Sequence, residues 1–321
     1  MTNTDKVNSA LCVGEESFLR LIGHNGVYVD KTGLIYELIC GPNGSVPKFL
    51  ARPRRFGKTL LMDTIQRIFE GRKELFAGLE IERRIGDKWD AFPVIRLSMN
   101  NTSPEPALFE ESLLQILKES AKTNNHISLK SSHPSGAVME LVNRLTRRYA
   151  RRIKPSVSGD WTGLKLSEAG NVVLLIDEYD FPLIHNIGKP EGQEEIRLAL
   201  HAFYSSIKGC ANFLRFVLVT GVTKFRQLSV FSGMNNMHDI SLNKDYAAIC
   251  GFTREEIESA FAQHLEPALA GLKLNSEISQ DSTKDDLVES LLKWYDGYSW
   301  DGDSRVLNPF SVMNFFSNKT V

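Results

Sequence analysis

The sequence predicts an α/β fold, a three-layer sandwich with a parallel central sheet, followed by a smaller helical region. Two segments, 172–176 and 216–219, are apolar at every position, as expected for parallel strands buried on both faces. Segments with helical periodicity alternate with the strands, so right-handed crossovers should join the strands into one sheet. At 321 residues the chain can bury such a core and still carry a second, smaller unit.

The predicted elements follow in a regular order up to residue 242. Apolar residues at helical spacing predict helices around 17–22 and 34–39, and a strand at 47–51 leads into Arg52-Pro53-Arg54-Arg55-Phe56-Gly57-Lys58-Thr59. Beyond these we expect a helix at 60–69, a strand at 92–99, helices near 106–121 and 135–152, an exposed loop at 155–170, and the strands 172–176 and 216–219.

After Ile240-Ser241-Leu242 the pattern predicts helices only. The first of them should begin at Thr253, because Thr253 can cap a helix and Glu256 stands where it completes a capping box. We therefore place a domain boundary near residue 245. Residues 1–245 would form the α/β core, and residues 246–321 a C-terminal helical domain.

Composition argues against several classes of protein. The formal net charge of -1 gives no global field toward nucleic acid or an anionic membrane. The four cysteines are far apart and form no C-x-x-C pair, which disfavours a disulfide framework or a zinc knuckle. The polar N-terminus lacks a secretory pattern, and no window approaches the ~20 apolar residues that a membrane span needs. We expect a cytoplasmic protein with no membrane partner.

Residues 52–59 partly match the phosphate-binding loop signature G-x-x-x-x-G-K-[ST], with Arg52 at the position of the first glycine. A helix that starts at such a loop presents unpaired N–H groups and a dipole that favour an anion. Lys58 would reach the β- and γ-phosphates, and the Thr59 hydroxyl would bind Mg²⁺. Gly57 allows the backbone to approach the phosphate closely. The alternative is an ordinary basic loop that opens a surface helix.

A second signal follows the apolar strand 172–176. Asp177 and Glu178 match the Walker B pattern, in which the first carboxylate holds Mg²⁺ and the second activates water. Two adjacent carboxylates at a buried strand end are costly without a cation, although structural acids at such turns are common. Because ligands of parallel sheets bind beyond the C-terminal strand ends, both clusters are expected at one edge. Together they predict a P-loop NTPase.

These motifs and four others resemble those of the AAA-ATPase-like family, P-loop ATPases of the STAND or AAA-like type whose members are often fused to a PD-(D/E)XK nuclease-like domain. The matches occur in one order over nearly the whole chain: Tyr28-Val29-Asp30-Lys31-Thr32, residues 52–59, Leu175-Ile176-Asp177-Glu178-Tyr179-Asp180, Thr220-Gly221-Val222-Thr223-Lys224-Phe225, Phe231-Ser232-Gly233-Met234-Asn235-Asn236 and Trp294-Tyr295-Asp296-Gly297-Tyr298.

The resemblance implies an ASCE-type sheet and an Arg52 that is usual for the family. It places the strand that ends at Thr220 between the P-loop strand and the Walker B strand, so that Thr220 can sense the γ-phosphate. Lys224 would add positive charge to the transition state, as an arginine finger does. The alternative for Thr220 and Lys224 is a capped strand end and a solvated lysine.

The predicted site follows from the residues and the resemblance together. Arg54 and Arg55 suit phosphate oxygens, or Glu178 in the resting state, because guanidinium makes bidentate contacts with either. Asp30 and Lys31 precede the loop, where related ATPases bind the base and ribose. We expect the cofactors ATP and Mg²⁺, with Thr59 and Asp177 as metal ligands. The expected catalytic residues are Lys58, Glu178, Thr220 and Lys224. The expected nucleotide contacts come from Asp30, Arg54, Arg55, Phe56, Gly57, Lys58, Thr59 and Leu60.

The sequence also gives expectations for the C-terminal part and for the partners. Relatives continue beyond Asn308-Pro309-Phe310 into the nuclease-like part, and no acid-x-lysine set follows here, so we do not expect DNA cleavage by these residues. Residues 246–321 would form a helical or winged-helix lid. A basic stripe at helical spacing would be the contact for nucleic acid, or else a solvated helix face: Arg144, Arg147, Arg148, Arg151 and Arg152.

Three functions remain open at this stage. The first is an ATPase whose hydrolysis resets a conformational switch acting on a protein effector. The second is a nucleotide-gated binding module with negligible turnover that recruits a nuclease or another effector. The third is a nucleic-acid remodelling motor, which would need a ring of subunits or a basic channel. Glu178 favours the first, because a module that only binds nucleotide needs no carboxylate to activate water.

Overall fold

The computed structural model describes residues 9–150, 170–224, 230–231, 234, 236–295 and 297–318. Its centre is a five-stranded parallel sheet in the order β2-β3-β4-β1-β5. The strands are β1 (Lys48–Ala51), β2 (Val94–Ser98), β3 (Val172–Asp177), β4 (Leu214–Gly221) and β5 (His238–Asp239). The predicted α/β fold with a parallel sheet is confirmed. As the resemblance implied, β4 lies between β1 and β3.

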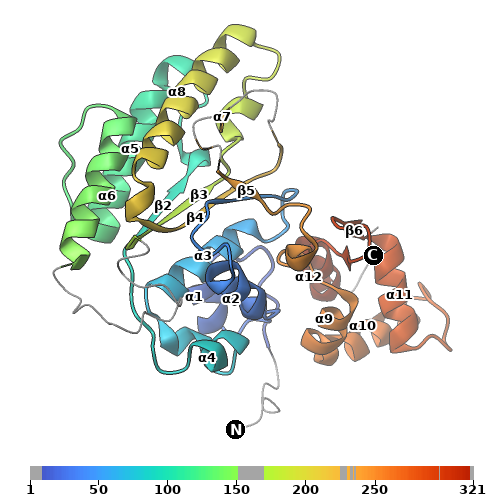
Figure 1. Cartoon of the computed structure of the whole chain (residues 1–321). Helices are drawn as coiled ribbons and strands as arrows, with labels where there is room; N and C mark the ends of the chain where they lie inside the picture. The colour runs from blue at the N-terminus through green and yellow to red at the C-terminus, as the bar shows by residue number, and fades with distance from the viewer. Residues whose placement is uncertain are drawn as a thin grey trace.

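One face of the sheet is covered by α5 (Pro106–Asn125), α6 (Pro134–Ala150), α7 (Phe181–Ile184) and α8 (Pro190–Gly209), as Figure 1 shows. Val172, Leu174 and Ile176 of β3 belong to the hydrophobic cluster on this side. The side chains of Val173 and Leu175 belong to the cluster on the other side. Successive residues of a strand point to opposite faces, so a strand between two helical layers must be apolar throughout.

The other face packs against α1 (Phe18–Gly23), α2 (Thr32–Cys40), α3 (Lys58–Phe69) and α4 (Glu80–Ile85). Helix α3 shows why this layer forms: Leu61, Met62, Ile65, Ile68 and Phe69 recur at helical spacing and are all buried. Short 3-10 helices connect the larger elements at Lys73–Phe76, Met99–Asn101, Ala211–Phe213 and Lys244–Tyr246.

The C-terminal region contains α9 (Arg254–Ala260), α10 (Ala262–Leu274), α11 (Lys284–Trp294) and α12 (Pro309–Asn318), and it lies beside the sheet rather than on either face (Figure 1). The capping box at Thr253 and Glu256 is confirmed. The prediction of helices only was wrong, because β6 (Tyr298–Ser299) and β7 (Arg305–Val306) form an antiparallel hairpin. Two-residue strands are too short to show an alternating pattern in the sequence.

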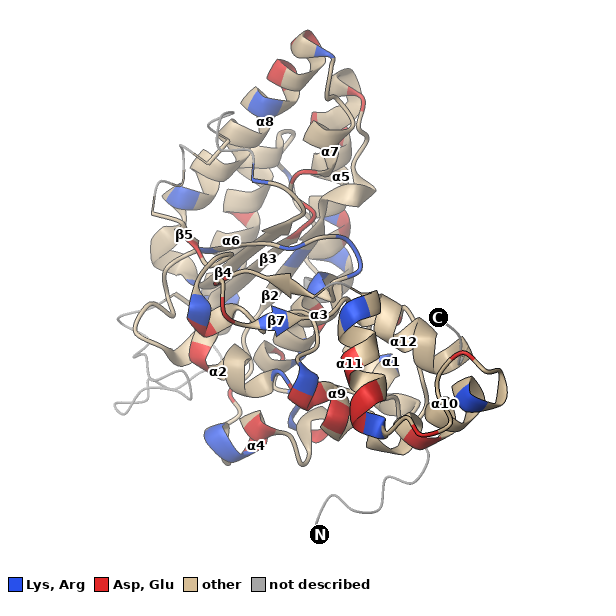
Figure 2. Cartoon of the chain, turned by 90° about the vertical axis from the view of Figure 1, so that its right-hand side faces the viewer, with Lys and Arg blue, Asp and Glu red and all other residues tan. Residues whose placement is uncertain are grey.

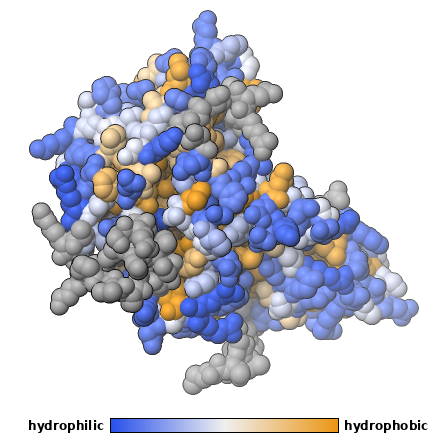
Figure 3. Space-filling view, viewed as in Figure 1, coloured by the Kyte–Doolittle hydropathy of each residue, from blue (hydrophilic) through white to orange (hydrophobic). Residues whose placement is uncertain are grey.

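The C-terminal region is packed against the start of the chain. Val27 and Val29 share a hydrophobic cluster with Phe261, Leu265 and other residues of this region. Its outer surface carries charges of both signs, with acidic and basic residues mixed over α9 and α11 in Figure 2, and the view in Figure 3 is mostly hydrophilic. Within the described ranges, no helix is both long and apolar enough to span a membrane.

Candidate functional site

Residues 52–57 form the loop that joins β1 to α3. Gly57 stands at the helix N-cap with φ 87°, a left-handed conformation that glycine adopts without a Cβ penalty, and no side chain caps this helix. A Cβ built on Gly57 would meet no heavy atom within 4 Å, so the space in front of the helix is open. The first N–H groups of α3 have no partner within the helix and face an environment suited to an anion.

Lys58 is 6% exposed and folds back onto its own loop. Its Nζ donates to the carbonyl oxygens of Arg52 at 3.0 Å and Pro53 at 2.9 Å. Burial lowers the pKa of Lys58, while Asp177 and Glu178 are among the acidic groups that act in the opposite direction. Lys58 and Glu178 also line one pocket, so the start of α3 and the acidic end of β3 meet at one edge of the sheet.

The end of β3 is an ordered carboxylate site. Asp177 is 2% exposed, and its Oδ1 accepts hydrogen bonds from the hydroxyl of Thr220 and, at 3.0 Å, from the amide of Glu178. Glu178 has φ 54°, which turns the chain sharply as it leaves the strand. Burial, and then the charge of Asp177, raise the pKa of Glu178. A carboxylate in such surroundings holds a proton more readily than one in water.

Asp180 and Tyr179 hold the turn after β4. The Oδ2 of Asp180 accepts from the amides of Val222 and Thr223 at 2.8 and 2.7 Å, and from the Thr223 hydroxyl at 2.7 Å. The hydroxyl of Tyr179 donates to the Thr223 carbonyl at 3.0 Å. Both residues belong to the motif Leu175–Asp180, but the sequence indicated no role for either of them. Their position directly after two candidate catalytic acids was the available signal.

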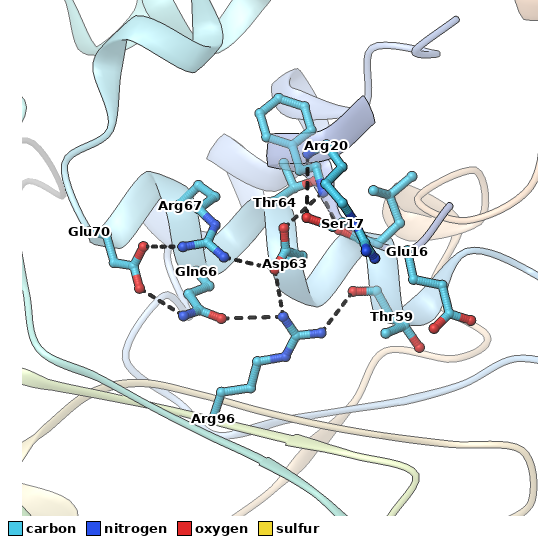
Figure 4. A network of polar contacts seen from close by, with 12 residues as sticks. Glu16, Ser17, Arg20, Thr59, Asp63, Thr64, Gln66, Arg67, Glu70 and Arg96 are labelled. Carbon is cyan, nitrogen blue, oxygen red and sulfur yellow. Dashed lines mark hydrogen bonds and ion pairs between the residues drawn. The ribbon is translucent and has the colours of Figure 1, made fainter. Parts of the chain in front are cut away.

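A second network, which the sequence analysis missed, fixes α3 from below (Figure 4). Arg96 of β2 donates to the Asp63 carboxylate at 2.7 Å and to the Thr59 carbonyl at 3.3 Å. The other oxygen of Asp63 accepts the amide of Phe18, the first residue of α1, at 2.8 Å. One buried carboxylate thus joins the sheet, α3 and α1. Helical periodicity could not reveal it, because its partners are 33 and 45 residues away.

These elements surround a pocket of about 360 Å³. The phosphate-loop residues 54–59 and Glu178 form its polar end. The rest of the lining, called its apolar end, is mainly apolar but includes the charged Glu15, Glu16 and Lys31. It comes from the N-terminal segment and the C-terminal region and includes Val27, Tyr28, Val29, Ile249, Cys250, Phe252, Phe310 and Met313. The lining therefore combines polar groups of the loop and Glu178 with mainly apolar groups of two segments distant in sequence, and the two parts meet where the Arg55 guanidinium lies over the ring of Phe310.

Most of the predicted site residues meet at this pocket. Its lining includes Arg54, Arg55, Phe56, Gly57, Lys58, Thr59, Leu60 and Glu178. Asp177, which directly precedes Glu178 in the sequence, accepts a hydrogen bond from Thr220. The guanidinium of Arg55 lies 3.8 Å from Glu16 and over the ring of Phe310, so in this structure it pairs with Glu16.

Of the predicted residues, Asp177, Thr220, Asp30 and Lys224 do not line the pocket. Asp30 accepts hydrogen bonds from Thr32 and from the amide of Glu80, while its neighbour Lys31 does line the pocket. Lys224 forms an ion pair with Asp239 at 2.8 Å. The nucleotide and catalytic roles predicted for Asp30 and Lys224 stay predictions.

The basic stripe is described only in part, since Arg151 and Arg152 lie outside the described residues. Arg144 contacts Glu140 at 3.1 Å and the carbonyl of Ser128. Arg147 and Arg148 lie in the last turn of α6. Of the motifs quoted for the family resemblance, Phe225, Ser232, Gly233, Asn235 and Asp296 also lie outside the described residues.

The parallel sheet, the glycine-capped helix and the adjacent carboxylates define an α/β protein with P-loop-like architecture. The profile of the family described as "Predicted AAA-ATPase" matches residues 12–231 of the chain. This match covers more than half of the sequence and includes both clusters of the site. The chain belongs to the AAA-ATPase-like family.

A curated relative extends the similarity to nearly the whole chain. It is the "Uncharacterized protein in vnfD 5'region" of Azotobacter chroococcum mcd 1, which is 32% identical over 313 residues, 96% of this chain and 52% of the relative. The chain thus spans about half the length of this relative. The aligned part includes both the sheet and the C-terminal region.

Proposed function

We propose that the chain binds ATP together with Mg²⁺ and hydrolyses it, and that the bound nucleotide sets the conformation of the C-terminal region. One observation carries this proposal: Lys58 at the start of α3 and Glu178 at the end of β3 line the same pocket. Membership of the AAA-ATPase-like family supports nucleotide binding and hydrolysis. Each step below depends on the chain's own residues.

The triphosphate would occupy the polar end of the pocket. Gly57 leaves open space before the first N–H groups of α3, and a backbone of this shape binds phosphate through these donors. Lys58 would exchange its two carbonyl partners for phosphate oxygens, which are stronger acceptors because they are charged. Arg54 and Arg55 line the same end and add donors for phosphate oxygens.

The oxygen donors near the loop suit Mg²⁺, which prefers oxygen ligands from hydroxyl and carboxylate groups and from water. Thr59 and Asp177 are the residues that would hold the ion. Within the described ranges, the hydrogen-bond donors to Asp177 both bind Oδ1, which would leave Oδ2 for a cation or its bound water. When bound, Mg²⁺ neutralises charge that develops on the transferred phosphoryl group.

Glu178 would accept the proton of the attacking water. Its side chain lines the pocket, and burial raises its pKa, which makes the carboxylate a better proton acceptor at neutral pH. Thr220, hydrogen-bonded to Asp177, would sense the γ-phosphate. In this structure the partner of Lys224 is Asp239, and its predicted contribution to the transition state would require it to leave that ion pair.

The base would lie in the apolar end of the pocket, between the N-terminal segment and the C-terminal region. Because residues such as Phe252 and Met313 line that end, nucleotide binding would stabilise the packing of the C-terminal region on the core. Residues 246–321 would then act as a separate lid domain whose position depends on the nucleotide. A partner protein would recognise the position of this lid, and the molecule would therefore act as a switch.

The proposal is tested with wild type, Lys58→Ala and Glu178→Gln, with the exposed Lys118→Ala as control. ATP binding is measured by calorimetry and turnover by phosphate release. We expect Lys58→Ala to lose binding, and Glu178→Gln to bind ATP with Mg²⁺ but release phosphate at least about a hundredfold more slowly.

Other outcomes decide among the alternatives. Absence of binding by wild type refutes the proposal. Equal, very slow release by wild type and Glu178→Gln favours a nucleotide-gated binding module. Release that DNA or RNA accelerates favours a motor on nucleic acid.

A further inference from the structure

The residue that replaces the first glycine of the phosphate loop is a buried arginine. Arg52 is 1% exposed, although it carries a charge. Its guanidinium donates to the carbonyls of Ala51 at 2.9 Å and Ser241 at 2.7 Å, and to that of Tyr246 at 3.2 Å. These carbonyls satisfy the two terminal nitrogens of the guanidinium, which lowers the cost of burying it, whereas the buried Nε has no hydrogen-bond partner among the described residues. Its partners at 241 and 246 belong to the segment that leads into the C-terminal region.

An aromatic ring covers the same guanidinium. The centre of the Arg52 guanidinium lies 4.5 Å from the ring centroid of Trp300, which follows β6 directly. Arginine stacks on an aromatic ring through its planar group, whereas lysine has no such plane. Arg52 therefore contacts both the 241–247 segment and the hairpin.

Phe56, at the other end of the loop, reaches the same hairpin. Its ring is fully buried and lies 4.8 Å from the ring of Tyr298 and 5.9 Å from that of Trp300. Gly251 lies so close that a Cβ there would come within 3.0 Å of the Phe56 ring. The two anchored residues flank Arg54 and Arg55, which line the pocket. Both ends of the loop are thus attached to the C-terminal region.

The backbone of Arg52 contacts the lysine that would bind phosphate. The Arg52 carbonyl accepts a hydrogen bond from Lys58 Nζ at 3.0 Å, and Lys58 must give up this bond to reach a phosphate. Arg52 therefore contacts Lys58 through its main-chain carbonyl and the hairpin through its side chain. Packed groups of this kind tend to change between discrete arrangements rather than deform gradually.

We propose that Arg52 is a positioning residue that couples the phosphate loop to the β6–β7 hairpin, with Trp300 as the side chain that changes its surroundings when nucleotide binds. This inference rests on the proposed function, because it concerns the same site. The coupling runs through the Arg52 guanidinium and through the ring of Phe56.

The first test uses the fluorescence of Trp300 in the full chain. ATP with Mg²⁺ is added to wild type and to Trp300→Phe, and the difference between the two emission changes isolates Trp300 from the other three tryptophans. We expect a change in wild type that Trp300→Phe removes and that Arg52→Gln strongly reduces. ATP binding without any Trp300-dependent change overturns the coupling and leaves the proposed function intact.

The second test separates positioning from stability. Arg52→Gln, Arg52→Lys and the exposed control Arg83→Gln are compared at a temperature where all are folded, as monitored by circular dichroism. We expect Arg52→Gln to lower kcat by about tenfold to a hundredfold with a smaller change in KM, because small displacements of catalytic groups have effects of this size. Arg52→Lys should recover part of the loss. A wild-type kcat in Arg52→Gln refutes the inference.

A variant at Trp300 covers the case in which Arg52→Gln fails to fold. Trp300→Leu leaves the hydrogen-bond partners of Arg52 in place and removes the ring that lies on its guanidinium and beside Phe56. We expect a reduced kcat in this variant as well, and a wild-type kcat would overturn the coupling. Failure of wild type to bind ATP at all refutes the proposed function, and the coupling falls with it.

Discussion

The two halves of the site are held in different ways. The acidic half, at the ends of β3 and β4, is held by contacts between two neighbouring strands and their turns: Asp177 with Thr220, Asp180 with Val222 and Thr223, and Tyr179 with Thr223. The basic half, the loop between β1 and α3, is held by residues about 190 positions or more further along the chain, in the 241–247 segment and the hairpin.

This difference indicates which half can transmit a signal. The acidic half is tied within the sheet, so we expect it to stay in place when nucleotide binds. The loop is tied to the C-terminal region, so a change in the loop reaches that region directly. A rigid half beside a movable half is the arrangement that the proposed nucleotide switch requires.

Asp180→Ala should have the largest effect on the free energy of unfolding, and it tests how firmly the acidic half is held. The change leaves the amides of Val222 and Thr223 without their carboxylate acceptor, which we expect to lower the free energy of unfolding by about 3 kcal/mol. Urea denaturation measures this loss, with the exposed Asp87→Ala as control. A loss equal to that of the control would show that the turn after β4 does not depend on Asp180.

Lys31→Met tests a second connection between the core and the C-terminal region. Lys31 is 8% exposed, and its Nζ lies 2.6 Å from both oxygens of Glu256 in α9. Removing the lysine leaves the partly buried carboxylate of Glu256 without its cation, so we expect the free energy of unfolding to fall by about 2 kcal/mol. A double-mutant cycle with Glu256→Gln measures the coupling energy. Additive effects of the two changes would contradict a direct interaction.

Phe56→Leu should have a smaller effect on stability but a specific effect on nucleotide affinity. The shorter side chain leaves part of the space beside Tyr298 unfilled, which should cost about 1 kcal/mol. Phe76→Leu is a matched control, since Phe76 is equally buried on the same side of the sheet but does not line the pocket. We expect only Phe56→Leu to weaken ATP binding in calorimetry. Equal affinities in the two variants would remove Phe56 from the coupling.

Asp239→Asn should have the smallest effect on the free energy of unfolding, and this effect should depend on pH. Burial opposes ionisation of Asp239, but hydrogen bonds from Lys224 and Ser241 outweigh it, so its pKa is lowered in the folded state. A lowered carboxylate pKa contributes stability that is present above the ordinary value of about 3.9 and is lost as the pH falls through the folded value.

Because this ion pair is partly exposed, the free energy of unfolding of wild type should exceed that of Asp239→Asn by no more than about 1 kcal/mol at neutral pH. Urea denaturation at several pH values should show the difference shrinking in acid. A difference that grows in acid would contradict the assignment. Faster phosphate release in the variant would indicate that Asp239 restrains Lys224.

The sequence alone determined the local features of this protein. The apolar strand 172–176, the helix after Gly57 and the capping box at Thr253 depend on residues close together in the chain, and each appears in the structure. Because parallel strands end at a common edge, the sequence also predicted that the loop and the acidic pair would meet. The periodicities of 2 and 3.6 residues are local properties, which a single sequence displays directly.

Tertiary structure alone decided how the site is supported. The contacts of Arg52 with Ser241 and Trp300, and those of Arg96 with Asp63, join residues between 33 and about 250 positions apart. The sequence showed Arg52 as a departure from a glycine signature that is usual for the family but indicated no role for its side chain, and the hairpin was too short to recognise. Side-chain contacts across such separations depend on the packing of the whole chain, which no local pattern encodes.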